Sequence, residues 1–320
     1  MANISLPLPG GATQVEQDFG FGRLVSGQHG YRLLNRDGSY NIRLENASLG
    51  SRIFSYHTLL SISWPTFFGV FAATYLLLNA LFATLYSAAG PDELQGTMHG
   101  SMYLRAFFFS VHTLATVGYG SISPVGTLAN WIVTVETLTG LALFALFTGL
   151  VFARFSRPVA GIVYSRNALI APYRGITALE FRVVNSKSNP LFNLEAVVAL
   201  SRFEETPSGR DRKFHTLKLE RDKVAFFPLN WTIVHPIDEN SPLRGWTKQM
   251  LVEAEAEIFV LITAIDDTFS QTVNSRASYT PREIEFGKKF VLMYQQRDTH
   301  MLLDLGRLDV TEPAELRAVP

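Results

Sequence analysis

The sequence contains no cysteine among its 320 residues, which excludes disulfide frameworks, thiolate metal sites and cysteine nucleophiles. Charged residues are also scarce, at 18% of the chain against about 25% in an average globular protein. Lysine plus arginine number 28, as do aspartate plus glutamate, so no cationic excess is present to hold a nucleic-acid backbone. A secreted disulfide scaffold, a nucleic-acid-binding protein and a disordered chain are therefore excluded.

The sequence motifs of common enzyme classes are also missing. We find no phosphate-binding P-loop, no dinucleotide G-x-G-x-x-G, no zinc-binding H-E-x-x-H and no nucleophile elbow. A membrane-anchored enzyme therefore has no support, and we expect neither catalytic residues nor a cofactor.

Apolar residues are concentrated in two long runs. Residues 65–91 contain no charge, and residues 125–153 contain one charged group, Glu136. Because a helix needs about 20 apolar residues to cross the bilayer core, each run predicts a membrane span. Residues 103–120 are apolar but too short to span and end in glycines, which favours a re-entrant segment between the two spans.

The flanking charges predict the orientation of these spans. Cations gather before the first span and after the second, at Arg43, Arg52, Arg154, Arg157 and Arg166. The positive-inside rule then places both termini in the cytoplasm. No basic stretch followed by an apolar run opens the chain, so we expect no cleaved signal peptide and a multi-pass protein of the cell (inner) membrane.

Four parts are expected along the chain. Residues 1–46 form an N-terminal cytoplasmic segment, and residues 47–63 mix apolar and polar groups as an interfacial helix does, although a plain connecting loop is the alternative. Residues 64–157 form a two-helix pore domain. Residues 158–320 contain short segments rich in β-branched and aromatic residues, including 177–185, 194–203, 213–221, 223–234, 257–265 and 283–294. They predict an antiparallel sandwich with one short helix at 247–254.

The segment that ends the re-entrant run reads Thr-Val-Gly-Tyr-Gly, which is the sequence of potassium selectivity filters. A dehydrated K⁺ needs a cage of oxygens, and backbone carbonyls provide it only if successive carbonyls point to the same side. Gly118 and Gly120 tolerate the unusual φ angles that such a backbone requires. The hydroxyl of Thr116 can add an oxygen, while Val117 and Tyr119 are expected to point away and pack behind the loop.

One filter loop supplies one wall of a pore, so we expect a homotetramer that conducts K⁺. Residues 103–115 can form a pore helix whose C-terminal end directs partial negative charge towards the ion. The competing interpretation is a two-span receptor or assembly module with a vestigial pore loop. The two filter glycines favour conduction, since no other role requires both of them.

Five segments resemble those of prokaryotic inward-rectifier potassium channels of the KirBac type: residues 32–40, 63–65, 107–120, 148–158 and 235–243. The resemblance implies a slide helix at 47–60, an inner pore-lining helix at 128–155 and an immunoglobulin-like β-sandwich with a constriction at 266–272. It also implies a passive conduit gated at the inner-helix crossing and the cytoplasmic domain. By class, we group it with the voltage-gated channels.

Helical spacing places Thr137, Phe144, Thr148 and Phe152 along one face, which the resemblance makes the pore lining. Phe144 matches the position where strong rectifiers carry Asp or Asn, so we predict weak rectification. Phe152 matches a hydrophobic gate that closes by dewetting. On spacing alone, lipid-facing or interhelical packing is the alternative for both phenylalanines.

Gly140 and Gly149 interrupt the second span and are either hinges or close-packing positions. Glu136 is an ionisable group inside a span, so we expect it to support the filter from behind. His112 in the pore helix is its candidate partner, and such a pair would make the filter sensitive to pH. The alternative is that each polar group is satisfied separately or by water.

Arg52, Arg154 and Arg157 lie where anionic phospholipid headgroups are expected, and the resemblance adds control by such lipids. Simple positive-inside topology explains the same arginines. His235, with Asp238 and Glu239 nearby, has the residue types of a metal site, but the spacing favours structural hydrogen bonds in a turn.

Overall fold

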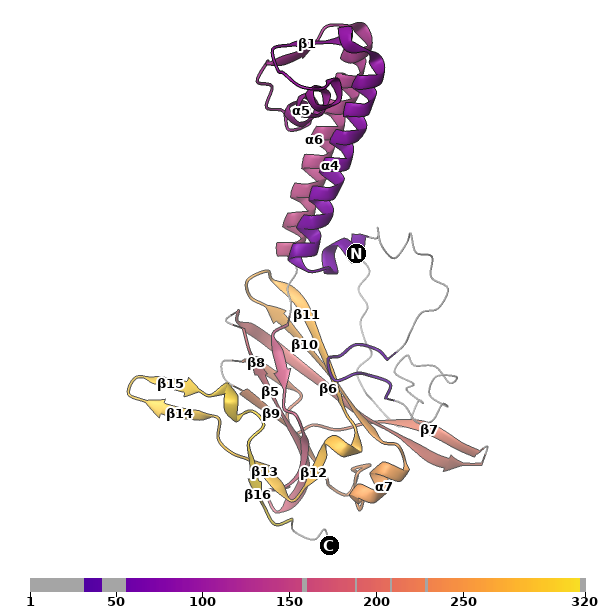
Figure 1. Ribbon diagram of the computed structural model, residues 1–320. Coiled ribbons are helices and arrows are strands. Elements are labelled where there is room, and N and C mark those ends of the chain that lie inside the picture. Colours follow the sequence, from indigo (N-terminus) through magenta and orange to yellow (C-terminus); the bar gives the residue numbers. More distant parts are fainter. Residues whose placement is uncertain are drawn as a thin grey trace. The chain divides into compact units, whose positions relative to one another are not determined.

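The computed structural model describes residues 32–41, 56–156, 160–187, 189–207, 209–227 and 230–316. The chain divides into two compact units, Leu44–Arg157 and a second unit that combines Met1–Arg43 with Pro158–Pro320. The first unit is helical and the second is built mainly of strands (Figure 1).

The helical unit contains a short helix and two long ones with a medium-length helix between them. In chain order these are α3 (Tyr56–Ser61), α4 (Trp64–Ala89), α5 (Met102–Leu114) and α6 (Thr127–Phe155). Ser63 caps α4, because its side chain accepts a hydrogen bond from the backbone N–H of Thr66. Ser101 caps α5 in the same way through the N–H of Leu104.

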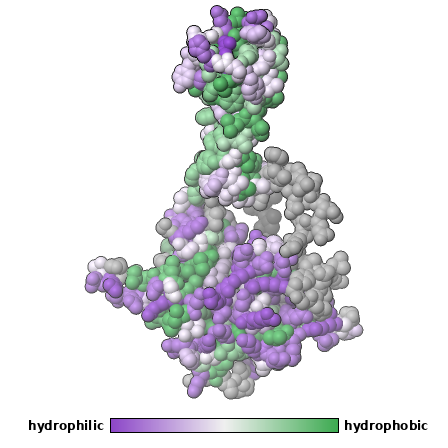
Figure 2. Space-filling view, viewed as in Figure 1, coloured by the Kyte–Doolittle hydropathy of each residue, from purple (hydrophilic) through white to green (hydrophobic). Residues whose placement is uncertain are grey.

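Both long helices are long and apolar enough to cross a membrane. Little of either is buried within the chain, and their exposed surface is mostly apolar, which Figure 2 shows in green. A soluble core helix would instead be largely buried. The two predicted spans are therefore present, and α5 lies between them as a helix too short to span.

A compact core joins the three helices at one end of this unit. Its buried members are Phe82, Ala83, Tyr86, Leu94, Ala106, Phe109, Leu114, Ile122 and Ala129. The connections pair as β1 (Leu94–Gly96) with β2 (Ile122–Pro124), next to the turn η1 (Pro91–Glu93). The carboxylate of Glu93 accepts the N–H of Ala129 at 2.9 Å and so caps the start of α6.

The β-rich unit is a sandwich of two five-stranded sheets. One sheet has the order β11-β10-β6-β7 with β8 also on β6, and the other has the order β12-β4-β5-β3 with β9 also on β5. The strands of the first sheet are β6 (Leu191–Thr206), β7 (Gly209–Thr216), β8 (Lys223–Phe226), β10 (Glu257–Asp266) and β11 (Gln271–Tyr279). Those of the second are β3 (Ile162–Tyr164), β4 (Ala168–Tyr173), β5 (Ile176–Asn185), β9 (Asn230–Pro236) and β12 (Ile284–Phe286).

The core between the sheets is formed by alternate apolar residues, among them Phe181, Leu194, Leu200, Ile233, Ile258 and Ile262. Helix α7 (Lys248–Glu253) lies within the predicted short helix and is capped by Thr247. The C-terminal part of the unit also contains two small strand pairs, which are β13 (Lys288–Phe290) with β16 (Thr311–Pro313) and β14 (Tyr294–Arg297) with β15 (His300–Leu303). Two short 3₁₀ helices lie in the same part of the chain, η2 (Pro281–Glu283) and η3 (Leu305–Arg307). The predicted sandwich is confirmed, and its strands pair antiparallel except β12, which runs parallel to β4.

The limits of several predicted strands differ from the structure, and the largest differences are in three of them. Residues 223–234 form two strands, because the chain leaves one sheet after β8 and joins the other as β9. Residues 283–294 are divided among β12, β13 and the start of β14. Strand β7 ends at Thr216, five residues before the end of the predicted segment.

Candidate functional site

The filter loop is attached to the last turn of α5 by three backbone hydrogen bonds. The N–H of Thr116 donates to the carbonyl of Thr113 at 3.0 Å. The N–H groups of Val117 and Gly118 both donate to the carbonyl of His112, at 2.8 and 3.3 Å. The start of the loop is thus held by the C-terminal end of the pore helix.

Every second residue of the loop has a left-handed backbone. The φ angles are 57° at Thr116, 59° at Gly118 and 76° at Gly120. Alternation of left-handed residues with ordinary ones turns successive carbonyls to the same side, as the sequence argument required. The positive φ at the two glycines was predicted. That at Thr116 was not, since a β-branched residue in this region is strained by about 1–3 kcal/mol.

The two larger filter side chains are exposed within one chain. The ring of Tyr119 meets the imidazole of His112 edge-on at 4.9 Å between centroids, yet 75% of Tyr119 is accessible. Val117 is also exposed. Within one chain, the Tyr119 ring therefore contacts His112 of the pore helix, but the side chains of Val117 and Tyr119 are not enclosed.

Glu136 is completely buried and does reach the pore helix. One carboxyl oxygen is 2.6 Å from the hydroxyl of Tyr86 on α4, and the other is hydrogen-bonded to the hydroxyl of Ser110 on α5. The structure therefore gives Glu136 different partners from the His112 that we expected. Sequence reasoning missed Tyr86, Ser110 and also Asn79, whose amide oxygen is 3.0 Å from the Ser110 hydroxyl.

The two glycines of α6 have different surroundings. A Cβ atom on Gly140 would lie 2.5 Å from the carbonyl oxygen of Leu114, the last residue of the pore helix. A Cβ atom on Gly149 would meet nothing within 4 Å. The close-packing interpretation therefore fits Gly140, while Gly149 is free of any such contact.

The expected pore-lining residues differ in their exposure on a single chain. Phe144 is 71% exposed and Phe152 is 73% exposed. Thr148 is also exposed, and its hydroxyl donates to the Phe144 carbonyl at 2.9 Å, whereas Thr137 is half-buried. Three of the four thus lie on surface that one chain leaves uncovered.

Arg154 makes its hydrogen bonds within the helical unit. Its guanidinium donates to the carbonyls of Leu59 and Ile62, at 2.5 and 2.6 Å, and lies over the rings of Trp64 and Phe67 at 4.5 and 4.7 Å. These contacts tie the end of α6 to the α3–α4 junction. The other two arginines assigned to lipid, Arg52 and Arg157, lie outside the described residues.

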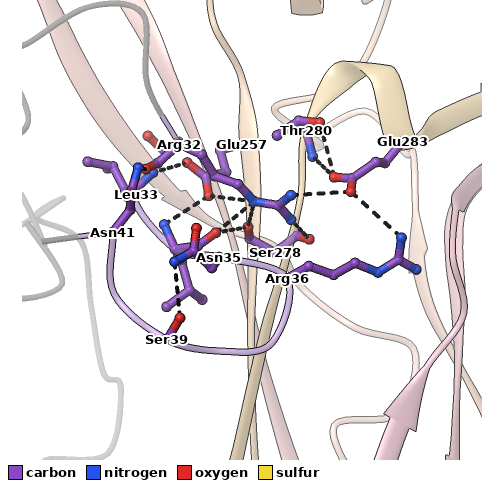
Figure 3. A network of polar contacts seen from close by, with 12 residues as sticks. Arg32, Leu33, Asn35, Arg36, Ser39, Asn41, Glu257, Ser278, Thr280 and Glu283 are labelled. Atoms are coloured by element: carbon purple, nitrogen blue, oxygen red, sulfur yellow. Dashed lines mark hydrogen bonds and ion pairs between the residues drawn. The ribbon is translucent and has the colours of Figure 1, made fainter.

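The N-terminal segment 32–41 is bound to the sandwich through a buried carboxylate (Figure 3). Glu257 accepts the N–H groups of Leu33 and Leu34 at 3.0 and 3.2 Å. Arg32 donates to the side chain and carbonyl of Ser278 and pairs with Glu283 at 3.2 Å. Burial raises the pKa of Glu257, and the two backbone donors act against this rise.

The histidine considered as a metal ligand has a structural role. Both ring nitrogens of His235 are used, one with the carbonyl of Lys218 at 2.6 Å and the other with the hydroxyl of Ser241 at 2.8 Å. Burial lowers the pKa of His235. Among the residues that the structure describes, no group of three or more acidic or histidine side chains forms a metal site.

The predicted constriction at 266–272 is the turn between β10 and β11. The carboxylate of buried Asp266 accepts the N–H groups of Thr268 and Phe269, at 2.9 and 3.2 Å. Its second oxygen accepts from the amide of Asn189. These bonds hold the turn in one conformation.

Comparison with known proteins gives two family matches. Residues 162–318 match the model of the inward rectifier potassium channel C-terminal domain, and residues 66–157 match an ion channel model. The inward rectifier potassium channel Kirbac3.1 of Paramagnetospirillum magnetotacticum is 40% identical over 279 residues, which cover 86% of this chain and 94% of the relative.

More distant relatives come from animals. The inward rectifier potassium channel irk-1 of Caenorhabditis elegans is 25% identical, over 90% of this chain and 58% of the relative. The inward rectifier potassium channel 4 of Homo sapiens is 25% identical, over 88% of this chain and 72% of the relative.

The receptor with a vestigial pore loop is not favoured by these matches. The grouping with voltage-gated channels is wrong, since inward rectifiers are not voltage-gated. A voltage sensor needs a row of arginines in a membrane helix. Of the membrane-length helices in the described part of the chain, α4 has no charged residue and α6 has Arg154 alone among cations. The chain belongs to the prokaryotic KirBac-type branch of the inward rectifier potassium channel family, and it is a channel for K⁺ rather than an enzyme.

Proposed function

We propose that four copies of the chain assemble around the filter loop and that their backbone carbonyls replace the water around K⁺. The ion sites are formed by Thr116, Val117, Gly118 and Tyr119, with the Thr116 hydroxyl as the innermost oxygen. The alternation of positive φ angles at residues 116, 118 and 120 carries this proposal. It is the backbone form that directs a column of carbonyls to one side.

The homotetramer is supported by the surface that one chain leaves open. Val117 and Tyr119 of the filter are exposed, as are Phe144, Thr148 and Phe152 of α6. A closed ring gives each exposed filter side chain a neighbouring copy to pack against, and it turns one face of α6 towards a central axis.

The inner helices contain the gate in this proposal. Four Phe152 rings close the pore by excluding water, and Gly149 is the hinge, since its surroundings leave room for the helix to bend. Phe144 places an uncharged ring where a carboxylate would attract Mg²⁺ and polyamines. Rectification is therefore weak.

The channel resides in the cell (inner) membrane with both termini in the cytoplasm. The length and apolar composition of α4 and α6 support the membrane location, and the flanking cations support the orientation. Domain limits at residues 46, 63 and 157 separate the N-terminal segment, slide helix, pore domain and sandwich. Anionic phospholipids modulate the channel through Arg52 and Arg157, with Arg154 contributing charge from within its hydrogen-bonded position.

Reconstitution in liposomes tests the proposal. We expect the purified tetramer to take up Rb⁺ or K⁺ in preference to Na⁺ and to be blocked by Ba²⁺. Gly118→Ala places a side chain at a φ of 59°, so it should abolish uptake while the tetramer stays intact. A monomeric protein, equal uptake of Na⁺, or normal uptake by Gly118→Ala would overturn the proposal.

A further inference from the structure

A chain of polar side chains crosses the interior of the helical unit and joins all three of its main helices. It consists of Glu136 on α6, Ser110 on α5 and Tyr86 and Asn79 on α4. All four residues are fully buried. Buried polar groups need hydrogen-bond partners, so the position of each proton among these four side chains can be worked out.

The amide of Asn79 has a defined orientation. Its nitrogen donates to the carbonyl of Tyr75 at 2.8 Å, so its oxygen is the atom that faces Ser110 at 3.0 Å. An amide oxygen can only accept. Because this oxygen cannot donate, its contact with Ser110 is a hydrogen bond only if the single hydroxyl proton of Ser110 points to Asn79.

The Ser110 oxygen can then only accept from its other neighbour, which is a carboxyl oxygen of Glu136. A carboxylate has no proton to donate, so an ionised Glu136 would face Ser110 without a hydrogen atom between them. Tyr86 does not supply the missing proton, because its own hydroxyl donates to the other carboxyl oxygen at 2.6 Å. One proton is needed, and only the carboxyl group itself can carry it.

We propose that Glu136 is a neutral carboxylic acid in the folded channel and that its O–H donates to Ser110. The completed sequence of donors runs from Glu136 through Ser110 to Asn79, while Tyr86 donates to the remaining carboxyl oxygen. Glu136 is thus a positioning residue that fixes the pore helix against α4 and α6. It does not contact the ion.

The surroundings of the carboxyl group agree with this assignment. None of the ion pairs among the described residues includes Glu136. On α5, the imidazole of His112 packs against Tyr119 and is not hydrogen-bonded to Glu136. A buried carboxylate without a cation is strongly disfavoured inside a membrane protein, whereas a neutral acid with both oxygens hydrogen-bonded is not.

Infrared difference spectroscopy of the reconstituted tetramer measures the proton directly. We expect the wild-type minus Glu136→Gln spectrum at neutral pH to contain the carbonyl stretch of a protonated carboxylic acid. The same band should move in Ser110→Ala, which changes one of its hydrogen bonds. A carboxylate band in its place would overturn the proposal.

Ion uptake measures the positioning role. Glutamine preserves both a donor towards Ser110 and an acceptor for Tyr86, so Glu136→Gln should keep uptake and the preference for K⁺ over Na⁺ within about twofold. Glu136→Leu leaves the Tyr86 hydroxyl without its acceptor, and we expect the preference to fall by about tenfold or more. Thr134→Val is the matched control, because that hydroxyl bonds only to its own helix.

An inactive Glu136→Gln channel, or a fully selective Glu136→Leu channel, would refute the positioning role. The effect on uptake depends on the proposed filter, but the infrared band does not. A wild-type protein that fails to select K⁺ would refute the filter assignment alone and leave the proton assignment to be decided by the spectrum.

Discussion

Replacing Gly140 with alanine tests whether α6 sets the position of the filter through backbone contact. The new Cβ atom would lie 2.5 Å from the carbonyl oxygen of Leu114. An ordinary carbon–oxygen contact is about 3.3 Å, so the two helices must separate by about 0.8 Å. Leu114 is two residues beyond His112, whose carbonyl holds the N–H groups of Val117 and Gly118.

The effect on stability should be smaller than the effect on selectivity. Overpacking costs about 1–3 kcal/mol, and alanine returns about 1 kcal/mol through its higher helix propensity. The net loss is therefore about 0–2 kcal/mol, which a folded tetramer tolerates. A shift approaching 1 Å at the end of the pore helix, by contrast, changes the spacing of the carbonyls that surround K⁺.

The matched control is Gly149→Ala on the same helix, where the added methyl group meets no neighbour. We expect Gly140→Ala to reduce the ratio of Rb⁺ to Na⁺ uptake in liposomes, and Gly149→Ala to keep that ratio while slowing opening if Gly149 is the hinge. Thermal unfolding of the detergent-solubilised tetramer measures stability in parallel. Equal ion discrimination in the two variants would refute the reasoning.

Three further predictions concern separate parts of the chain. In Phe144→Asp, internal spermine should block outward current through the channel in planar bilayers, and Phe144→Leu is the control. An Asp variant that spermine does not block would mean that this side chain does not face the pore. Glu257→Ala leaves the buried N–H groups of Leu33 and Leu34 without their acceptor. Hydrogen–deuterium exchange at these two amides should therefore accelerate by about tenfold or more. Unchanged exchange would contradict the assigned contact. Burial raises the pKa of Glu180 from its usual 4.5 to about 7. The folded state therefore binds this proton more tightly than the unfolded state does. As the pH rises from about 4.5 to about 7, the free energy of unfolding should fall by about 2 kcal/mol, a value that allows for partial solvent screening. Tryptophan fluorescence of the purified channel during denaturation would show this slope, and Glu180→Gln should remove it; an equal slope in both proteins would exclude Glu180 as its origin.

The spans and the filter could be predicted from the sequence because each obeys a strong local constraint. The thickness of the bilayer sets the length of an apolar run, so α4 and α6 were found to within two residues at each end. A backbone that turns its carbonyls to one side favours glycine, so the left-handed conformation of Gly118 and Gly120 was predicted as well. The same reasoning could not identify Thr116, because its strain is held by its surroundings rather than encoded in its residue type.

The partners of Glu136 could not be predicted for a different reason. The sequence shows that a buried acid needs a partner, but Ser110, Tyr86 and Asn79 become neighbours only through the rotation of three helices about their axes. Many hydroxyl groups lie within these helices, and nothing local separates the ones that meet. A histidine looked more suitable on charge alone, although His112 lies against Tyr119.

Strand limits failed where the chain changes sheets. Residues 223–234 have the composition of one strand, yet β8 pairs with β6 and β9 pairs with β5. Composition records that a residue suits a half-buried pleated surface, and it does not record which sheet provides that surface.

The anchoring of residues 32–41 by Glu257 has a consequence for how the chain connects its two units. The covalent chain runs from this anchored segment through the membrane helices and returns to the same β-rich body at Pro158, so it forms a closed circuit. The helical unit is therefore joined to the β-rich unit at both of its chain ends. Cutting the chain between residues 41 and 56 would leave the two units covalently joined at one end only, while Glu257 would still hold residues 32–41 on the sandwich.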